Sequence, residues 1–371
     1  MKIVFLCGSL EAGRDGVGDY TRSMAAELIK NGYTVALLAI NDAFITEVFS
    51  GLQSNKGINI PVLRMPSSYN NYNKTKLATA WVNDFNPEWL SLQFVPFAYH
   101  KKGLPFKLVR FLQKLGNGRQ WHVMFHELWV GMGAHASKKH VFWGGIQRRL
   151  IKSMVSELKP EVIHTHTWLY QAQLAKIKIK ATLLPLFSNI PRIESPHKSN
   201  LYSNAEIRLI FFGSLHPFTD LQSFLNEILN FQKNSELMVS LQFLGRSGPQ
   251  LHIWQQACDR MRIETKIFGE QDPENISRLL QNAHAGVTTT ALPMIQKSGS
   301  VAAMQEHGLP VICISGEWLV RGMDSPAPPE GIFKLKANII ESCLRTFIRG
   351  AHLNSLTNIS ERFVENLQAN S

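Results

Sequence analysis

One stretch near the C-terminal end combines reactive residue types with a spacing that a helix would hold, KSGSVAAMQEHGLPVI (297–312). It opens on Lys297 and Ser-Gly-Ser, and a helix start offers backbone amides and hydroxyls to phosphate or sugar oxygens. Glu306 is the single carboxylate before Gly-Leu-Pro, and a carboxylate can accept hydrogen bonds from two vicinal hydroxyls. The stretch predicts a helix that holds a phosphate at its N-terminus and a sugar hydroxyl at its side. The plainer alternative is an ordinary cap and an exposed carboxylate.

A second candidate is a glycine loop after the first apolar run, GSLEAGRDGVGDYTR (8–22). Gly16 and Gly18 would let the backbone turn tightly and bring amides close to a bound group, and Asp19 would cap the helix that follows. A dinucleotide fingerprint would begin directly after the strand and carry a third glycine, which this loop lacks. A nicotinamide-dependent oxidoreductase is therefore the weaker hypothesis, although Asp42 supplies an acid at the end of the second predicted strand.

Histidines form the third candidate. His126 and Glu127 stand at the end of a strand-like run, and a neutral imidazole there could accept from a sugar hydroxyl or donate to an oxygen that bears charge. His164 and His166 lie on one face of another predicted strand, as metal ligands would, but no third ligand with matching spacing is present. We expect no metal site. Hydrolase motifs of the serine-elbow and zinc-protease kinds are absent from the sequence as well.

These residues need strands whose carboxyl ends lie at one edge, and alternating apolar runs and helical stretches predict such parallel α/β units. A stretch rich in Pro, Ser and Asn at 186–206 breaks the rhythm and is taken as the crossing between domains. We predict two tandem doubly wound Rossmann-like domains facing a cleft. Their predicted bounds are 1–195 and 196–340, with a helical tail at 341–371 that could pack back on the first domain. The predicted strands are 2–7, 33–40, 88–94, 121–125 and 161–165, then 207–213, 237–245, 265–269, 285–290 and 310–314.

Composition limits the classes of protein. A chain of 371 residues, with 44% apolar and 18% charged residues, is globular and long enough for two domains. No apolar run approaches the roughly 20 residues that cross a bilayer, and the N-terminal run is too short for a signal peptide. The four cysteines are far apart in the sequence, so we expect reduced, buried thiols in a cytoplasmic protein.

The positive charge is concentrated in two segments. Lys and Arg number 39 against 28 acids, a net charge of +11. Residues 101–119 carry six bases and no acid, and residues 138–159 carry six bases and one acid, with aromatic and aliphatic residues interleaved. Such segments are either solvated helix faces or a surface for peripheral contact with an anionic membrane or with nucleic acid.

Four stretches, in order, resemble glycosyltransferases of the GT-B architecture, most closely the large retaining family 4. They are DGVGDYTRSMAAELIKNGYTV (15–35), LGRSGP (244–249), GEQDPENISRLLQNAHAGVTTT (269–290) and the stretch at 297–312. The family commonly shows a Gly-Gly-Val-Gly loop before an Ala-rich helix, a Leu-x-Gly-x-Gly-Pro turn, and a donor helix with two Glu that ends in Gly-x-Pro-Val. The resemblance implies a metal-independent enzyme without a cofactor. It would move a sugar from a UDP- or GDP-linked donor to a hydroxyl acceptor, such as a glycan or a lipid-linked glycan, with retention of configuration.

The resemblance also implies roles for single residues. Glu306 falls where the family's second Glu bonds the ribose hydroxyls, and Ser298 replaces the first Glu, which contacts the transferred sugar. His126, beside Glu127, falls near a family His that approaches the sugar and the acceptor. It would position and polarise, because the leaving phosphate itself helps to deprotonate the acceptor. The implied donor-binding residues are Gly16, Gly18, Arg246, Lys297, Ser298, Gly299, Ser300 and Glu306.

The sequence departs from the family in one further place. The stretch FFGSLHPFTDLQSF (211–224) lacks the two bases that normally neutralise the leaving diphosphate, and Arg246 and Lys297 are the substitutes we expect. Three alternatives remain open at this point. They are a glycosyltransferase acting on nucleic-acid bases, a catalytically weak or inactive GT-B nucleotide-binding partner protein, and a nicotinamide-dependent oxidoreductase.

Overall fold

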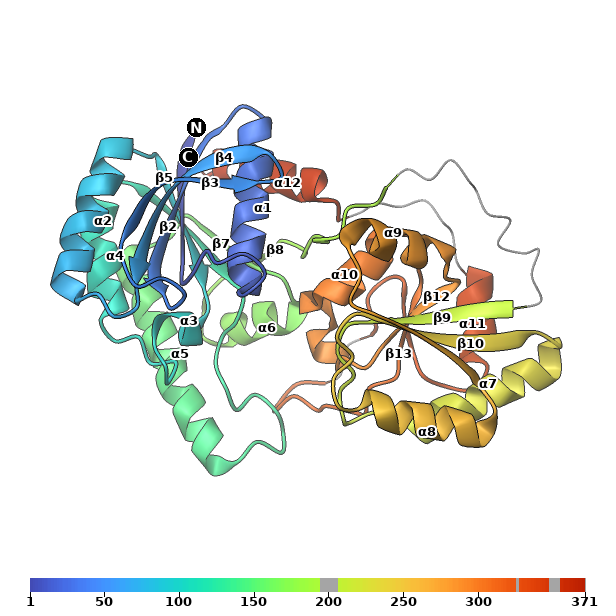
Figure 1. Cartoon of the computed structure of the whole chain (residues 1–371). Coiled ribbons are helices and arrows are strands. Elements are labelled where there is room, and N and C mark those ends of the chain that lie inside the picture. The colour runs from blue at the N-terminus through green and yellow to red at the C-terminus, as the bar shows by residue number, and fades with distance from the viewer. Residues whose placement is uncertain (194–205, 325–326, 347–353, 371) are drawn as a thin grey trace. The chain divides into compact units, whose positions relative to one another are not determined.

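The computed structural model describes residues 1–193, 206–324, 327–346 and 354–370. The chain divides into two compact units, one formed by Met1–Pro185 with Leu356–Ser371, and the other by Leu186–Ser355. Each unit is built on its own sheet, and the two sheets are blue to green and yellow to orange in Figure 1. Most of the predicted crossing, residues 194–205, lies outside the described residues. The prediction of two α/β domains, each built on its own mainly parallel sheet, is confirmed.

The sheet of the first unit has eight strands in the order β3-β4-β2-β1-β5-β6-β7-β8, all parallel except β3 with β4. Every residue of β5 and all but one of β1 are buried, as expected of strands covered on both faces. The order reverses between β1 and β5, and ligands of doubly wound folds bind at such a switch point. The strands are β1 (Lys2–Cys7), β2 (Thr34–Asp42), β3 (Phe49–Asn55), β4 (Ile58–Pro66), β5 (Trp89–Phe94), β6 (Gln120–Phe125), β7 (Val162–Thr165) and β8 (Thr182–Leu183).

Helices connect these strands, and the last helix of the chain joins the same unit. Helix α12, red in Figure 1, lies beside α1, where Thr357 donates to the Glu27 carboxylate at 2.8 Å and Phe363 stacks on Phe5 with ring centroids 5.6 Å apart. The helices of the first unit are α1 (Gly16–Lys30), α2 (Asn71–Phe85), α3 (Pro96–Tyr99), α4 (Leu108–Gly116), α5 (Lys138–Leu158), α6 (Trp168–Lys176) and α12 (Leu356–Gln368).

The hairpin of β3 and β4 was not predicted from the sequence. Lys56 and Gly57 form its two-residue turn, both with positive φ, 49° and 81°, which suits the twist of antiparallel strands. Most of β3 is exposed, so its residues lack the apolar run that marks a buried strand. The hairpin adds an antiparallel edge to an otherwise parallel sheet.

The sheet of the second unit has six parallel strands in the order β11-β10-β9-β12-β13-β14. This is the 3-2-1-4-5-6 order of dinucleotide-binding folds, with the switch point between β9 and β12. Its strands are β9 (Glu206–Phe212), β10 (Met238–Leu244), β11 (Glu264–Gly269), β12 (Ala285–Thr288), β13 (Val311–Cys313) and β14 (Ile332–Lys334). Its helices are α7 (Leu221–Ser235), α8 (Leu251–Met261), α9 (Pro273–Asn282), α10 (Gly299–Glu306), α11 (Ile339–Thr346) and the 3-10 helix η1 (Leu292–Lys297).

All four cysteines are buried free thiols, as the sequence predicted. Burial raises the pKa of Cys7 well above its ordinary value, with a smaller contribution from Asp15. These thiols therefore behave as small apolar core groups rather than as nucleophiles.

Candidate functional site

Three neighbouring strands of the second unit lead into glycines in the left-handed conformation. Gly213, Gly245 and Gly269, at the ends of β9, β10 and β11, have φ values of 85°, 82° and 61°. Glycine adopts such angles without strain, so the backbone can turn sharply at the end of each of these three strands. The Gly245 amide donates to the Gly269 carbonyl at 2.7 Å, and the Gly213 amide donates to the Leu244 carbonyl at 2.8 Å. The carboxyl ends of these strands thus present closely spaced backbone with no side chain at the turns.

Helix α10 begins beside this backbone, in the stretch that the sequence singled out. Ser298 is its N-cap, and the Ser298 hydroxyl accepts from the Val301 amide at 3.4 Å and lies 3.1 Å from the Ser300 hydroxyl. A Cβ placed on Gly213 would lie 3.8 Å from the Ser300 hydroxyl, so the helix start adjoins the end of β9. First-turn amides lack intrahelical acceptors, and together with the helix dipole they favour an anion. The predicted helix start is therefore at the carboxyl end of a central strand.

The two charged residues of this stretch bracket the helix. Lys297 is the last residue of η1, and Glu306 is the last residue of α10. His307, missed by the sequence analysis, is buried and anchors this end of α10. Its Nδ1 donates to the Ala303 carbonyl at 2.7 Å, and its Nε2 lies 2.8 Å from the Ser277 hydroxyl of α9. The signal available was a histidine directly after the only acid of the helix.

The loops after β9 and β10 are tied together at the same edge. The Thr289 hydroxyl accepts from the His216 amide at 2.9 Å, and the Leu215 amide donates to the Ser247 carbonyl at 3.0 Å. Thr289 follows β12, so these bonds span the switch point between β9 and β12.

Arg246, one of the two expected phosphate-binding bases, is engaged by an acid. Its Nε donates to the Glu270 carboxylate at 2.6 Å, and the two side chains are 80% and 63% exposed. Solvent screens an ion pair this exposed, so a phosphate could displace the carboxylate at small cost. The Arg246 carbonyl also lies 3.5 Å from the Ser214 hydroxyl, which places Arg246 on the loop next to the end of β9.

In the first unit, the helix after the glycine loop begins earlier than predicted. Asp15 is the N-cap, because its carboxylate accepts from the Val17 amide at 3.0 Å, and α1 starts at Gly16. Gly16 and Gly18 therefore lie in the first helical turn rather than in the loop, and Asp19 does not cap the helix. Both acids are good capping residues, but Asp19 is engaged by the Gly13 amide and by Arg22, and Asp15 therefore takes the capping role.

The side chain of Asp19 instead holds the loop. Its carboxylate accepts from the Gly13 amide at 3.0 Å and pairs with the Arg22 guanidinium. A Cβ on Gly18 would lie 2.5 Å from the Ser9 carbonyl oxygen, so only glycine permits the loop to fold this closely against the helix.

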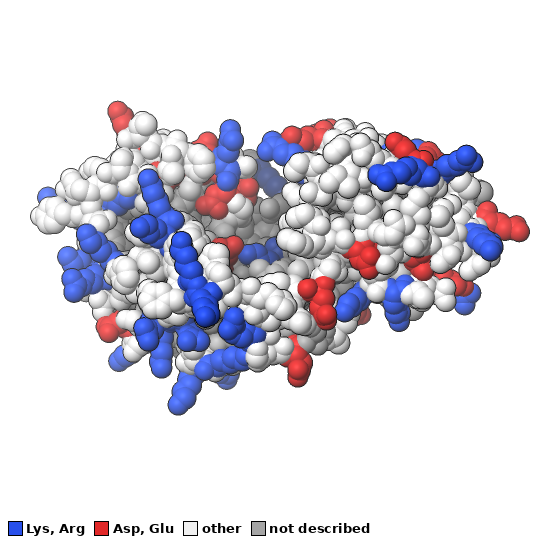
Figure 2. Space-filling view, turned by 90° about the horizontal axis from the view of Figure 1, so that it is seen from below, with Lys and Arg blue, Asp and Glu red and all other residues white. Residues whose placement is uncertain are grey.

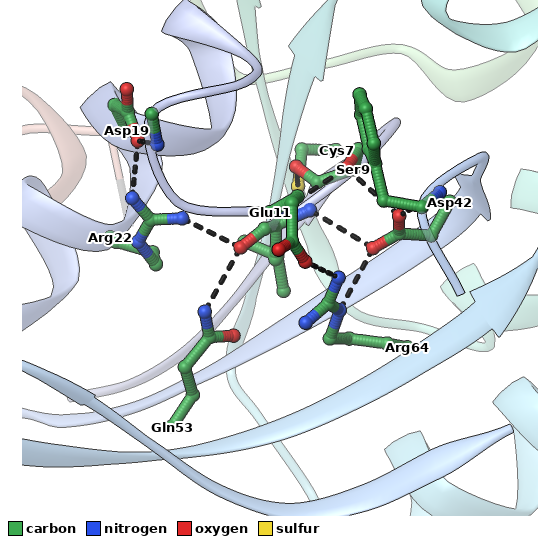
Figure 3. A network of polar contacts seen from close by, with 11 residues as sticks. Cys7, Ser9, Glu11, Asp19, Arg22, Asp42, Gln53 and Arg64 are labelled. Carbon is green, nitrogen blue, oxygen red and sulfur yellow. Dashed lines mark hydrogen bonds and ion pairs between the residues drawn. The ribbon is translucent and has the colours of Figure 1, made fainter.

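Asp42 anchors the other side of the loop, as Figure 3 shows. This fully buried carboxylate accepts from the Ser9 hydroxyl at 3.0 Å, from the Leu10 amide at 3.2 Å and from Nε of Arg64 at 2.8 Å, while Arg64 also contacts Glu11 at 2.6 Å. Burial acts to raise the pKa of Asp42, but the bonds from Arg64 and from backbone amides outweigh it and lower the pKa. Asp42 is thus committed to the loop, which argues against its use as the ribose-binding acid of an oxidoreductase.

His126 lies just beyond β6 and is buried. Its Nε2 lies 2.9 Å from Oε1 of Gln93, and its Nδ1 lies 3.0 Å from Nε2 of His166, whose Nδ1 is 2.9 Å from the Leu184 carbonyl. Tyr20 of α1 packs edge-on against both imidazoles, with ring centroids 4.9 and 5.3 Å away. The structure therefore brings the helix of the glycine loop onto the predicted catalytic histidine. Both ring nitrogens of that histidine have partners within the protein.

The polar chain continues from Gln93 across the sheet. Nε2 of Gln93 lies 2.8 Å from the Ser91 hydroxyl, which lies 2.7 Å from Nδ1 of His122. Nε2 of His122 lies 3.0 Å from Nδ1 of His164, and Nε2 of His164 lies 3.2 Å from the Asn366 amide nitrogen on α12. Burial lowers the pKa of His122 well below its ordinary value and that of His164 to about 3, so both rings are neutral at pH 7.

Matching donors to acceptors leaves two possible arrangements of hydrogens in this network of hydrogen-bonded side chains. Because a carbonyl only accepts, Nδ1 of His166 carries a hydrogen. With Oε1 of Gln93 facing Nε2 of His126, the His126–His166 pair must hold one extra proton. If the Gln93 amide is turned by 180°, its nitrogen donates to Nε2 of His126, and every ring is then neutral and donates from Nδ1. The amide orientation of Gln93 and the charge of the His126–His166 pair are therefore coupled.

The two histidines predicted to share one face of a strand belong to different hydrogen-bonded pairs. His164 binds His122, and His166 binds His126. Over the described ranges of the chain, no group of three or more His, Cys, Asp or Glu side chains is arranged to hold a metal ion. Glu127, the second predicted catalytic residue, is partly buried, and its amide lies 3.4 Å from the Phe94 carbonyl.

The two basic segments form one surface of the first unit. The Gln113 side chain of α4 donates to Glu157 of α5 at 2.9 Å, and Trp143 of α5 donates from Nε1 to the Lys102 carbonyl at 2.9 Å. Figure 2 shows Lys and Arg crowded on the first unit. Within the part of the chain that the structure describes, no helix is long and apolar enough to span a membrane. The exposed bases of the two segments are Lys101, Lys102, Lys107, Arg110, Lys114, Lys138, Lys139, Arg148, Arg149, Lys152 and Lys159.

Comparisons with known proteins identify the fold. No family model matches the sequence, and no curated protein shows significant similarity to it. Solved structures do match over the whole chain. One is Anabaena Alr3699/HepE in complex with UDP and glucose, at 13% identity, a TM-score of 0.55 and full coverage of both chains. A second is the lipopolysaccharide outer core galactosyltransferase WaaB, at 12% identity, a TM-score of 0.52 and coverage of 100% and 99%. A third is a UDP-forming α,α-trehalose-phosphate synthase from Burkholderia vietnamiensis, at 11% identity, a TM-score of 0.58 and coverage of 99% and 98%. The chain thus has the two-unit GT-B fold of these glycosyltransferases.

Proposed function

We propose that the protein is a glycosyltransferase that moves a sugar from a nucleotide-sugar donor to a hydroxyl acceptor. The observation that carries the proposal is the edge of the second sheet, where the start of α10 adjoins the glycine turn after β9. This arrangement suits a diphosphate at the Ser298–Ser300 amides, with Glu306 on the ribose and with Lys297 and Arg246 neutralising charge. Alr3699/HepE, which has the same fold, was crystallised with UDP and glucose, and this supports UDP as the first donor nucleotide to test.

The proposal extends to the chemistry. Transfer would proceed with retention and without a metal, and GDP is the second donor nucleotide to consider. His126 would act on the transferred sugar or the acceptor by positioning, with Gln93 as the partner that a ligand hydroxyl replaces. Gly16 and Gly18, now placed in the first turn of α1, would contribute first-turn amides toward the diphosphate, and Glu127 would lie near the acceptor. We propose that the protein works in the cytoplasm, where its buried thiols stay reduced.

The acceptor side of the proposal rests on the basic surface of α4 and α5. Exposed Phe106 and Phe142, 61% and 72% accessible, lie among its bases, and this mixture suits the headgroup region of an anionic membrane. We therefore favour a lipid-linked acceptor at the membrane periphery over a nucleic-acid acceptor. Vesicle flotation distinguishes them: binding to anionic vesicles that competing RNA does not abolish supports the lipid, and binding to RNA alone contradicts it.

The test of donor binding is a melting-temperature panel with UDP, GDP, ADP and their sugar conjugates. We expect one base to raise the melting temperature of the wild type and to lose its effect in Glu306→Ala. The control is Glu274→Ala, which removes an exposed acid of α9 that pairs with Arg278. No shift with any nucleotide would contradict the donor site.

One alternative keeps specific support. The position after Gly213 carries no base, Ser298 stands in place of an acid, and Arg246 is paired with Glu270. These features favour a GT-B protein that binds nucleotide with weak or no transfer. Slow release of free sugar from the stabilising nucleotide-sugar, measured over hours, would support the transferase. A nucleotide-induced rise in melting temperature without any release of sugar, in the presence of candidate acceptors, would support the binding protein.

A further inference from the structure

The first unit contains a pocket of about 630 Å³ between α2 and α4. Ile40 and Asn41 at the carboxyl end of β2 line it, and so do Tyr99 and His100 at the end of α3. Asn41 also connects the pocket to the glycine loop, because its amide donates to the Gly8 carbonyl at 3.0 Å. The pocket therefore lies at the sheet edge where ligands of this fold bind, one strand from the switch point between β1 and β5.

The charged lining of the pocket is entirely basic. Four of its lining residues are cations, and none of the residues that line it is an acid. Three of the cations stand on or beside α4 and are exposed to solvent, and the fourth, on α2, is buried. They are Lys107, Arg110, Lys114 and Lys74. A concave site with one sign of charge concentrates the field and attracts an anion.

Lys74 is the unusual member of this set. It is 6% exposed, and its Nζ lies 3.5 Å from Oδ1 of Asn41 and 3.4 Å from the Ser67 carbonyl. Both distances are at the outer limit of a hydrogen bond, both acceptors are neutral, and no ion pair of Lys74 occurs within the described ranges. Burial lowers the pKa of Lys74. Burying an ammonium group is costly without a counter-charge, so an anion in the pocket would stabilise it.

The rest of the lining is largely apolar and aromatic. Tyr72 and Phe106 are 77% and 61% exposed, and Leu104 and Phe111 continue the apolar surface. Exposed aromatic side chains beside a charged pocket indicate a ligand with an apolar part next to its anionic group. A free inorganic anion would leave this surface unused.

We propose that this pocket binds a phosphate ester with an apolar substituent, and that Lys74 makes the buried contact with the phosphate. Lys107, Arg110 and Lys114 complete the charge, while Tyr72 and Phe106 contact the apolar part. Binding of such a ligand stands on the pocket alone. Its role as the sugar acceptor rests on the proposed function.

The test measures binding by isothermal titration calorimetry in the absence of any nucleotide, so failure of donor binding cannot affect it. The probes are octyl phosphate, inorganic phosphate, and octyl glucoside as a neutral amphiphile. The variants are Lys74→Met and, as a matched control, Lys76→Met, which removes an exposed lysine from the same helix. We expect octyl phosphate to bind at least about tenfold more tightly than either other probe. Lys74→Met should weaken it about tenfold or more, as loss of a charged hydrogen bond does, and Lys76→Met less than about twofold.

Two further readouts keep the test decisive. Without ligand, Lys74→Met should melt at the wild-type temperature or above it, because it removes a buried charge; a merely structural lysine would lower the melting temperature. Arg110→Met, at the exposed rim, should fold normally and weaken octyl phosphate binding severalfold. Equal binding to wild type and Lys74→Met, or no binding of octyl phosphate at all, would overturn the proposal.

The same variants separate a lipid source from a soluble one. Wild-type protein that floats with phosphatidylcholine vesicles containing a long-chain alkyl phosphate, and Lys74→Met protein that does not, would assign the pocket to a membrane lipid. Wild-type binding to octyl phosphate in solution, without flotation, would assign it to a soluble phosphate ester. Flotation that is equal for both proteins would show that the vesicles bind elsewhere, and the pocket proposal would fail for lipids.

Discussion

Nδ1 of His126 lies 3.0 Å from Nε2 of His166, and the bond joins the ends of β6 and β7 beneath Tyr20. Because His166 donates its other nitrogen's hydrogen to the Leu184 carbonyl, the pair has one defined direction when neutral. We expect nitrogen NMR to show the Nδ1–H tautomer for both rings at pH 7.5, with the Gln93 amide nitrogen facing His126. An Nε2–H tautomer at His126 would contradict the neutral arrangement.

Gln93→Glu tests the coupling between this residue and the histidine pair. A carboxylate beside His126 favours an imidazolium, so the pair should hold its extra proton to higher pH than in the wild type. The measurement is an NMR titration of the imidazole nitrogens. Gln93→Leu is the control, because it removes the hydrogen bond without adding charge and should leave the pair neutral. If the Gln93→Glu and Gln93→Leu variants give the same titration, residue 93 does not set the charge of the His126–His166 pair.

His122 and His164 should make the protein sensitive to acid. Their folded pKa values lie far below the unfolded value near 6.5, so the unfolded chain takes up protons that the folded protein does not. Stability is then full above pH 6.5 and falls as the pH drops toward about 3. Between pH 7 and pH 5 each ring should account for a loss of about 2 kcal/mol in the free energy of unfolding.

Urea denaturation at the two pH values measures this loss. In His164→Gln the difference between pH 7 and pH 5 should shrink by roughly the share of one histidine, about 2 kcal/mol. His135→Gln, at an exposed position, serves as the control and should keep the wild-type difference. An unchanged pH dependence in His164→Gln would mean that this ring is not kept neutral by the fold.

Arg64 should be among the side chains most costly to remove from the first unit. Arg64→Met leaves the fully buried Asp42 carboxylate without its charged partner, and breaking a buried pair in this way costs about 3–5 kcal/mol. Glu11→Gln removes the other, more exposed partner of Arg64 and should cost only about 0–1 kcal/mol. Denaturant unfolding of both variants checks the contrast, and similar losses in the two would refute the central position of Asp42.

Two adjacent glycines of α5 should respond in opposite directions to alanine. A Cβ on Gly144 would lie 2.0 Å from the Val130 carbonyl oxygen, so Gly144→Ala must push α5 away from the loop after β6 and cost about 1–3 kcal/mol. A Cβ on Gly145 meets nothing within 4 Å, so Gly145→Ala should stabilise the helix by about 0.5–1 kcal/mol. The melting temperatures of the two variants test this prediction. A higher melting temperature for Gly144→Ala than for the wild type would contradict it.

The sequence predicted the central strands well and the edges poorly, for a physical reason. Strands covered on both faces, such as β1, are rich in apolar residues, and this composition makes them recognisable in the sequence. The β3–β4 hairpin has an exposed face and a Lys-Gly turn, and neither produces such a run. The start of α1 was misplaced because two acids, Asp15 and Asp19, compete for the same capping role and only three-dimensional contacts decide between them.

For the candidate site, features formed by neighbouring residues in the sequence were predicted, and contacts between distant residues were not. Helix α10 was predictable because its cap, its acid and its terminating glycine are neighbours in the sequence. The partners of His126 were not, since Gln93 and His166 are 33 and 40 residues away and become neighbours only through strand order. The pairing of Arg246 with Glu270 likewise depends on the adjacency of β10 and β11.

Helix α12 has a consequence for how the chain reaches this structure. Phe363 covers Phe5 and His122, and Asn366 contacts His164, yet some 170 residues of the second unit are translated between β8 and this helix. The ribosome therefore exposes the sheet of the first unit long before the helix that covers one part of it exists, and pairing across such a separation is slow. The packing of the first unit can therefore be completed only after the whole of the second unit has been synthesised.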